Sequence, residues 1–275
     1  MNLDSYAHLK LSMDGRCLLL EFDHGKANEI GREQLFEIER LVADLEAASD
    51  VMALVTTSRR RTRKGTPIFV SGANVTERIG WSTEDVAQHV RWQRRVVSNL
   101  RRIPQFHVVV VDGLALGWGT EYLLACDYRI ACPDAQFGLP ETGLGILPGA
   151  GGTGDLWLHV GVSQALRLGM TGERVGPEEA HRIGLVDERA VDFNAGLARA
   201  RELSELVARR SPTAVAAYKR ALLSNLGLPA EQREENEGRA YERCLASGDA
   251  AVGRSHFETI RQGGQAPWGP RRTLR

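Results

Sequence analysis

The sequence predicts a mixed α/β core of about 190 residues followed by a helical C-terminal part. Short apolar stretches typical of strands alternate with stretches of helical periodicity over the first two thirds of the chain. In the last third only the helical periodicity remains, with breaks at Pro212, Pro229 and Gly248. We therefore expect a core at residues 1–195 and a C-terminal helical region at residues 196–275.

The expected strands are short and mostly apolar. Two of them flank a turn at Asp14-Gly15, and the run from His107 to Val111 is of the kind buried on both faces of a sheet. The strands are expected at residues 7–12, 16–23, 51–57, 107–111 and 127–131. A basic loop, SRRRTRKGTP at residues 58–67, follows the third strand.

The expected helices carry their apolar side chains on one face. Thr83, followed by Glu84 and Asp85, gives one of them a start with acids in its first turn. The helices are expected at residues 32–48, 83–101, 194–209, 212–225, 230–246 and 249–261. The tail GQAPWGPRRTLR contains two prolines and no periodicity, so we expect it to be irregular.

Composition excludes several classes of function. The 35 Lys and Arg residues balance the 35 Asp and Glu residues, so the chain has no overall attraction to nucleic acid or to an anionic membrane. The longest apolar runs are too short to cross a bilayer, and the N-terminus lacks the apolar part of a secretory signal. The four cysteines lack metal or disulfide spacing, so we expect a cytoplasmic protein without a metal site.

Two segments contain acids beside glycine-rich turns. In VVVVDGLALGWGTE, a buried strand leads through glycines into a helix, where unpaired backbone N–H groups can hold an oxyanion near Glu121. In FGLPETGLGILPGAGGT, Glu141 lies among Leu139, Pro140 and Leu144. Apolar surroundings raise the pKa of a carboxyl group, which suits it to giving or taking a proton near neutrality.

A third segment, FVSGAN at residues 69–74, reads as a strand, a glycine and a helix start capped by Asn74. The backbone N–H of Ala73 is therefore a second candidate oxyanion donor.

These three segments resemble the enoyl-CoA hydratase/isomerase, or crotonase, superfamily, and the resemblance extends from about residue 8 to 260. It rests on VDGLALGWGTEYLLACDYRIA, FGLPETGLGILPGAGGT and VGVSQALRLGMTGERVGPEEAHRIGLVDE in this order. The resemblance implies a spiral of ββα units with C-terminal helices that build a homotrimer, or a hexamer of two trimers. It also implies an acyl-CoA thioester as substrate, with coenzyme A as part of the substrate and no separate cofactor.

The resemblance assigns a role to each candidate residue. It places the oxyanion hole at the backbone N–H groups of Ala73 and Trp118, and the catalytic carboxylates of a hydratase at Glu121 and Glu141. Family members that only move a double bond generally keep the second acid and lose the first. The implied substrate-binding residues are Lys26, Ala27, Asn28, Ser71, Gly72, Asn74, Gly117, Pro140 and Gly149.

The chain departs from the family pattern at several positions. Trp118 stands where glycine is common, so its indole either lines the acyl channel or packs in the core. We expect the first placement, in which Trp118→Gly changes the relative kcat/KM of short and bulky substrates by roughly tenfold. Asn74 replaces the usual Asp, and both residues can cap a helix. The basic loop 58–67 is either a solvated loop or a contact for the 3′-phosphate of coenzyme A.

Other readings were weighed against catalysis. Taken singly, Glu121 reads as a surface acid near a helix start and Glu141 as a turn residue, but together with the glycine turns they favour catalysis. The run from Gly149 to Gly154 resembles a dinucleotide fingerprint, yet it follows no strand of a βαβ unit and lacks the expected acid about 20 residues later. It reads better as a turn and helix start near the acyl site.

The sequence therefore predicts a hydratase that adds water across the 2,3 double bond of a 2-enoyl-CoA. Glu121 is expected mainly to activate the water and Glu141 mainly to deliver a proton to C2, although paired carboxylates share protons. Two alternatives stay open. One is an enoyl-CoA isomerase or acyl-CoA hydrolase on the same scaffold, and the other is a catalytically silent protein that binds coenzyme A.

Overall fold

The structure, a computed structural model, describes residues 1–272. Within them the main sheet has six strands in the order β1-β2-β3-β5-β7-β9. Neighbouring strands run parallel, except that β1 and β2 form an antiparallel hairpin. The strands are β1 (Lys10–Asp14), β2 (Cys17–Phe22), β3 (Ala53–Ser58), β5 (Phe106–Val111), β7 (Tyr128–Ala131) and β9 (Glu188–Arg189).

A second, smaller sheet has the parallel order β4-β6-β8. Its strands are β4 (Ile68–Val70), β6 (Leu114–Leu116) and β8 (Gln136–Gly138). Each follows a strand of the main sheet along the chain, so that strand pairs recur between helices. The mixed α/β class predicted from the sequence is therefore confirmed.

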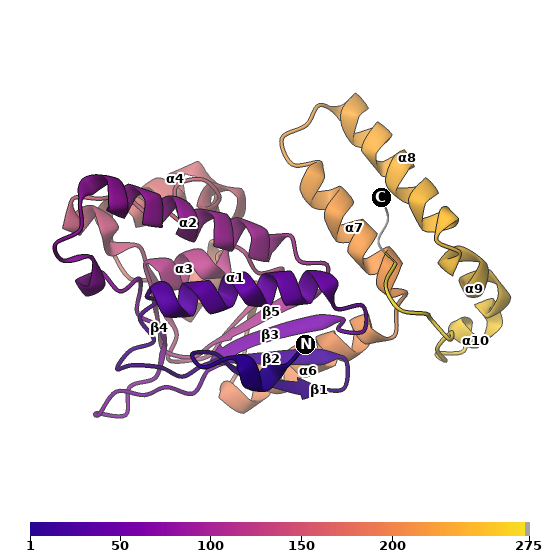
Figure 1. Cartoon of the computed structure of the whole chain (residues 1–275), viewed down its shortest axis with the longest axis horizontal. Coiled ribbons are helices and arrows are strands. Elements are labelled where there is room, and N and C mark those ends of the chain that lie inside the picture. The colour runs from indigo at the N-terminus through magenta and orange to yellow at the C-terminus, as the bar shows by residue number, and fades with distance from the viewer. Residues whose placement is uncertain (273–275) are drawn as a thin grey trace.

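Helices cover both faces of the main sheet (Figure 1). On one face lie α1 (Arg32–Ala47), α2 (Thr83–Arg101) and α3 (Trp118–Leu123), and on the other lies α6 (Phe193–Ala208). Successive side chains of a strand point to opposite faces. In β5, Val109 and Val111 therefore join the large core cluster, and Val108 and Val110 pack with Ala200 of α6. This explains why the strand is apolar throughout.

The remaining helices of the core are short or bent. They are α4 (Leu156–Thr171), which bends at Gly161, and α5 (Pro177–Arg182). Two single turns of 3-10 helix lie near the candidate site, η2 (Thr76–Arg78) and η3 (Pro140–Leu144), and a third, η1 (Leu3–Ser5), lies near the N-terminus.

The C-terminal helices form an extension of the core. Figure 1 shows α7 (Pro212–Ser224) and α8 (Ala230–Ala246) side by side and standing away from the sheet, with α9 (Asp249–Ser255) and α10 (Phe257–Arg261) beyond them. The tail then returns to the core, where the backbone N–H of Arg271 donates to Ser49 O (3.0 Å). The domain boundary near residue 195 stays a prediction, and α6, which begins at Phe193, packs on the sheet.

The structure corrects three expectations. The first strand begins at Lys10 rather than at residue 7, because the N–H groups of Ala7, His8 and Leu9 donate to the Glu37 carboxylate on α1 instead of to β2. The helix expected at 249–261 is divided at His256, whose backbone leaves the helical region (φ −111°, ψ 19°). The strands β6 and β8 were not expected.

The tail is irregular as far as Arg272, as expected, and its last three residues lie outside the described part. None of the helices in residues 1–272 is long and apolar enough to span a membrane.

Candidate active site

The glycine turn after β6 positions the first candidate oxyanion donor. Gly117 has φ 51° and ψ −119°, a conformation that side chains disfavour. A Cβ at this position would also lie 2.8 Å from Oε1 of Glu141. The turn makes Trp118 the first residue of α3, where a backbone N–H has no acceptor within the helix. The Trp118 amide is therefore available to a ligand.

The second candidate donor lies on the neighbouring segment after β4. The N–H of Ile30 donates to Gly72 O, and the N–H of Asn74 donates to Ile30 O, both at 2.9 Å. This pattern leaves the N–H of Ala73 without an acceptor in the described chain. The Cα of Gly72 lies 3.9 Å from the position of a Cβ on Gly117. The structure thus brings together the two segments that bear the candidate oxyanion donors.

Asn74 has the capping role expected from the sequence. Its Oδ1 accepts hydrogen bonds from the backbone N–H groups of Thr76 (3.2 Å) and Glu77 (3.3 Å), and so begins the η2 turn. The expected helix is a single 3-10 turn.

Glu121 lies in the first turn of α3, as expected, and is 3% exposed. Its Oε1 accepts the backbone N–H of Ala150 (2.7 Å) and of Gly152 (2.9 Å). Burial and, to a smaller extent, the charge of Glu141 raise the pKa of Glu121. The two N–H groups lower it, and the net result is a pKa of about 7. A carboxyl group with this pKa exists in both protonation states near neutral pH.

The hydrogen bonds from residues 149–154 to Glu121 were not predicted from the sequence. The run from Gly149 to Gly154 supplies the two donors from about 30 residues further along the chain. A Cβ on Gly152 would lie 2.5 Å from Pro148 Cβ, so the close approach requires glycine. The nearby glycines were the available signal, because a turn without side chains exposes its backbone N–H groups.

Glu141 lies in η3, directly after Pro140, and is half-buried. Its Oε2 is shielded from solvent and has no hydrogen-bond partner within the described chain. Burial raises the pKa of Glu141, as expected. The expected apolar surroundings are only partly present, since Leu139 is buried but Leu144 is 64% exposed. A buried and a half-buried carboxyl group thus lie beside two backbone amides that lack acceptors within the described chain.

The ionisation of Glu121 should make the fold less stable as pH rises. Its pKa of about 7 in the folded chain lies above the ordinary 4.5, so the folded state holds a proton that the unfolded chain has released. The contribution of Glu121 to stability should be greatest below pH 4.5 and should fall by roughly 3 kcal/mol as pH rises through about 7. Urea unfolding at a series of pH values, compared with Glu121→Gln, measures this fall. Identical pH dependence in both proteins would contradict it.

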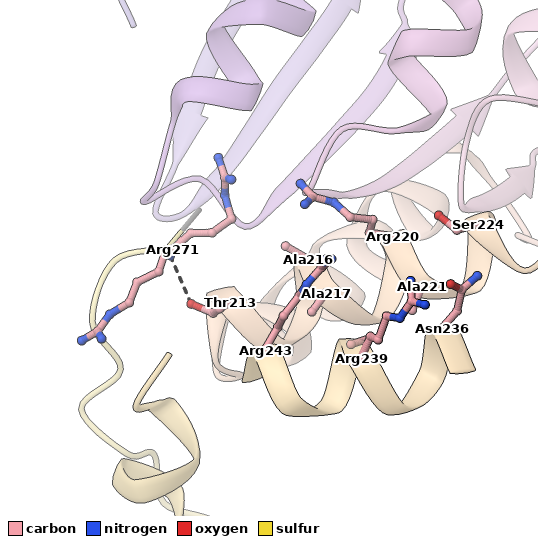
Figure 2. A pocket seen from close by; sticks show the side chains of 12 residues that line it. Thr213, Ala216, Ala217, Arg220, Ala221, Ser224, Asn236, Arg239, Arg243 and Arg271 are labelled. Atoms are coloured by element: carbon pink, nitrogen blue, oxygen red, sulfur yellow. Dashed lines mark hydrogen bonds between the residues drawn. The ribbon is translucent and has the colours of Figure 1, made fainter. Parts of the chain in front are cut away.

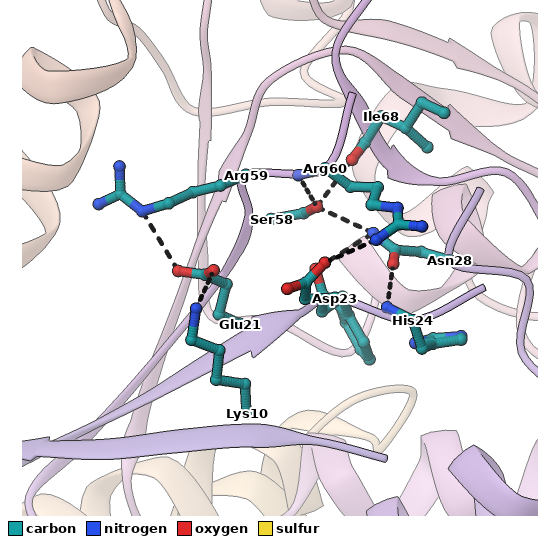
Figure 3. Close-up of polar contacts among 10 residues, drawn as sticks. Lys10, Glu21, Asp23, His24, Asn28, Ser58, Arg59, Arg60 and Ile68 are labelled. Atoms are coloured by element: carbon teal, nitrogen blue, oxygen red, sulfur yellow. Dashed lines mark hydrogen bonds and ion pairs between the residues drawn. The ribbon is translucent and has the colours of Figure 1, made fainter. Parts of the chain in front are cut away.

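Segments 26–28 and 71–74, both expected to bind substrate, lie side by side. The N–H of Ser71 donates to Ala27 O (3.1 Å), and Lys26 is exposed. The side chain of Asn28, however, is fully buried and holds the fold together (Figure 3). Its amide nitrogen lies within hydrogen-bond distance of Phe22 O, Phe69 O and Ser58 Oγ, and its Oδ1 accepts the N–H of His24.

The basic loop is largely neutralised where it leaves β3. Figure 3 shows Arg59 paired with Glu21 and Arg60 paired with Asp23, and Arg61 lies 3.6 Å from Asp112. Arg63 and Lys64 are exposed, and neither forms an ion pair within residues 1–272. These two are the residues of the loop that could meet a phosphate.

The Trp118 side chain packs into the core. It is 2% exposed, and its ring centroid lies 5.4 Å from that of Tyr122, one helical turn along α3. Tyr122 in turn contacts Phe22 and Phe69. Of the two placements considered for the indole, the structure favours the core over the expected wall of an acyl channel. The indole finds its space beside Tyr122 of α3 rather than beneath the glycine turn.

A separate pocket of about 120 Å³ lies between α7, α8 and the tail (Figure 2). Arginines dominate its wall, and the N–H of Arg272 donates to Thr213 Oγ1 (3.1 Å). Arg271 and Arg272 also bind the carbonyl groups of Ala48 and Ser247, which fastens the tail. Among residues 1–272, no carboxylate, histidine or cysteine lines this pocket, so these residues give it no group for proton transfer at neutral pH.

The chain is similar to known proteins along most of its length. A family model described as enoyl-CoA hydratase/isomerase matches residues 17–264. The chain is 30% identical to the short-chain-enoyl-CoA hydratase of Clostridium acetobutylicum, with 87% of this chain aligned to 90% of that protein. It is 33% identical to human enoyl-CoA hydratase domain-containing protein 2, mitochondrial, with coverages of 85% and 80%.

Among solved structures, the enoyl-CoA hydratase from Bacillus anthracis superposes with a TM-score of 0.87 at 28% identity. The superposition covers 95% of this chain and 99% of that one. The spiral fold and the C-terminal helices implied by the sequence resemblance are thereby confirmed.

Proposed function

The chain belongs to the enoyl-CoA hydratase/isomerase family, and we propose that it adds water to a 2-enoyl-CoA to give a 3-hydroxyacyl-CoA. Members of this family act on acyl-CoA thioesters. The relatives of this chain indicate that it is an enzyme of the hydratase type. The observation that carries the proposal is the pair of carboxyl groups, the buried Glu121 and the half-buried Glu141, beside the amides of Ala73 and Trp118.

In the proposed reaction the thioester oxygen lies between the N–H groups of Ala73 and Trp118. As the oxygen of water bonds to C3, the π electrons of the double bond move toward the thioester oxygen, where the two N–H groups stabilise the charge. Glu121 takes a proton from the water, and C2 receives a proton from Glu141. One O–H bond of water and the π bond between C2 and C3 break while one C–O and one C–H bond form, so the reaction needs no oxidant or reductant. A proton then passes from Glu121 back to Glu141 before the next turnover.

The environments of the two carboxyl groups support different tasks for them. Two backbone N–H groups fix Oε1 of Glu121, which leaves Oε2 to hold and activate water. Burial raises the pKa of both carboxyl groups, but Glu141 has no such donors at its shielded Oε2 within the described chain, which leaves that oxygen free to carry a proton. The assignment of Glu141 to proton delivery follows from this difference.

Product analysis with crotonyl-CoA tests the proposal. Hydration adds the mass of one water to the thioester, isomerisation of a longer enoyl-CoA adds nothing, and hydrolysis releases free coenzyme A. A catalytically silent protein would leave every thioester unchanged, although crotonyl-CoA could still raise its melting temperature by binding. Mass spectrometry that shows no water adduct with crotonyl-CoA or longer 2-enoyl-CoAs would refute the proposed hydration.

We also propose that the protein is cytoplasmic and assembles as a trimer or hexamer. Apolar side chains on the C-terminal helices are exposed in the single chain, among them Tyr218 (72%), Leu222 (51%) and Tyr241 (68%). Exposed apolar groups gathered on one part of a protein are typical of an interface. Because α7 and α8 stand away from the sheet in Figure 1, their outer faces are left for a second subunit.

Light scattering is expected to give three or six times the chain mass of 30.3 kDa. Leu222→Asp should lower the measured mass, because a charge would be buried at the interface. Val191→Asp is the matched control. Val191 is 83% exposed and lies outside the C-terminal helices, so this change should leave the mass unchanged. A wild-type monomer mass that does not vary with concentration would contradict the assembly.

A further inference from the structure

Four buried polar atoms without hydrogen-bond partners gather between η2 and α2. They are Glu77 Oε1, Arg78 Nε, His89 Nε2 and Gln93 Nε2. His89 is 6% exposed and Gln93 is 4% exposed. Folded proteins pair nearly all of their buried polar groups, so a group of unpaired ones requires an explanation. A ligand that supplies the absent partners is one such explanation.

Arg78 is the charged donor of this cluster. Its Nη2 donates to Gln93 Oε1 at 3.3 Å, and no carboxylate within the described chain lies at ion-pair distance from it. The bond uses the oxygen of the Gln93 amide and leaves its Nε2 as a donor. Burial lowers the pKa of Arg78, as expected for a cation held away from water. A half-buried cation without an ion-pair partner in the described chain favours an anionic ligand.

The neighbouring Glu77 favours the charged form of Arg78 but forms no ion pair with it within residues 1–272. Oε2 of Glu77 accepts the backbone N–H of Arg32 (3.1 Å), and its Oε1 lies 3.7 Å from Nε2 of His89, too far for a hydrogen bond. Burial, together with the charges of Arg78 and Arg32, lowers the pKa of His89 to about 4. His89 is therefore neutral near pH 7 and can still donate or accept one hydrogen bond.

The cluster adjoins both halves of the proposed reaction centre. Arg78 follows the oxyanion donor Ala73 by five residues, through the single turn that Asn74 caps. On α2, Val90 and Arg94 follow His89 and Gln93, and both touch Gly149 in the loop that holds Glu121. The acids act on C2 and C3, which lie on the acyl side of the thioester carbonyl. The cluster thus adjoins the Ala73 segment through η2 and the Glu121 loop through α2.

Space for a ligand group exists next to the cluster. A cavity of about 400 Å³ is lined by Arg32, Trp81, Asp85, Gln88, His89 and Trp92, so His89 is the member of the cluster that reaches it. The rings of Trp81 and Trp92 each pack edge-on against His89, with centroids 5.3 and 5.6 Å away.

We propose that Arg78, Gln93 and His89 bind the far end of the acyl chain, and that the preferred substrates are 2-enoyl-CoA thioesters whose chain ends in a carboxylate. This proposal rests on the hydration proposed above and names the substrate class for it. Arg78 Nε and Gln93 Nε2 supply the N–H donors that two carboxylate oxygens accept, and the guanidinium supplies the opposite charge. A chain that ends in a methyl group would leave these donors unpaired, which lowers its affinity.

The test compares carboxylate-ended and methyl-ended 2-enoyl-CoA thioesters of matched chain length. For the wild-type protein, kcat/KM should be at least about tenfold higher with the carboxylate-ended thioesters. Arg78→Met should remove this preference by slowing the carboxylate-ended substrates at least about tenfold, while the methyl-ended ones react as fast or faster. Turnover of the methyl-ended thioesters also shows that the variant is folded. Arg91→Met is the matched control on α2, because Arg91 is exposed and paired with Glu84.

The outcomes separate this inference from the proposed function. A wild-type protein that hydrates methyl-ended thioesters faster would overturn the inference and leave the hydration standing. An Arg78→Met variant that slows both substrate series equally would also overturn it, since that pattern indicates a structural role. Failure to hydrate either series would overturn the proposed function and the inference together.

Discussion

Replacing either Glu121 or Glu141 by glutamine is expected to lower the rate of crotonyl-CoA hydration by about 10²-fold or more. Each substitution keeps the size of the side chain and removes its ability to exchange a proton. In Glu121→Gln the amide oxygen can still accept the N–H groups of Ala150 and Gly152, so the loop should stay in place. The measurement is kcat and KM for crotonyl-CoA in the three proteins, with circular dichroism to confirm folding.

A surface acid provides the control for this experiment. Glu178, on α5, has an 88% exposed side chain, and Glu178→Gln should leave both constants unchanged. If Glu141→Gln loses activity while Glu121→Gln keeps it, the reaction depends on one acid, as expected for an isomerase. Near-normal hydration in either variant would therefore refute the assignment of a catalytic pair.

The second large effect is expected on stability. Trp118→Ala should lower the free energy of unfolding by about 3–5 kcal/mol, since it removes a large buried side chain and leaves a cavity beside Tyr122. Because the indole packs in the core, the ratio of kcat/KM values for short and bulky 2-enoyl-CoAs should not change. Urea unfolding at one fixed protein concentration gives the first quantity, and steady-state kinetics gives the second.

Trp157 is the matched tryptophan for comparison. It is 48% exposed, and its Nε1 donates to Gly154 O (2.8 Å) at the surface. Trp157→Ala should therefore destabilise the protein much less than Trp118→Ala. A Trp118 variant of normal stability, with a tenfold shift in the kcat/KM ratio, would place the indole in the acyl channel instead.

Elements with a long periodic pattern could be predicted from the sequence. The helix expected at residues 83–101 is α2 with the same bounds, and the continuous apolar run up to Val111 is β5 at the centre of the sheet. Strands β6 and β8 have three residues each, which is too few for a period to appear. The start of β1 depends on Glu37, a residue of a different element, so local sequence could not reveal it.

The candidate site could be predicted only in part, for the same reason. Glycines beside acids indicated Glu121 and Glu141, because that combination is visible within one short segment. The cluster of Arg78, His89 and Gln93 had no such sign, since each residue taken singly is an ordinary helix or turn residue. Its unusual property is that buried polar atoms lack hydrogen-bond partners within the described chain. This property exists only in the folded structure and cannot be recognised in the sequence.

The two edge strands of the main sheet offer little opportunity for pairing with a strand of another copy of the chain. At one edge, β1 carries Lys10 and Asp14, which pair with Glu21 and Arg201, and at the other edge β9 has two residues. Short or charged edge strands resist pairing with strands of other molecules. Growth of the sheet into fibrils is thus disfavoured at both ends, and even a weakened variant should stay dispersed in solution for as long as its sheet remains folded.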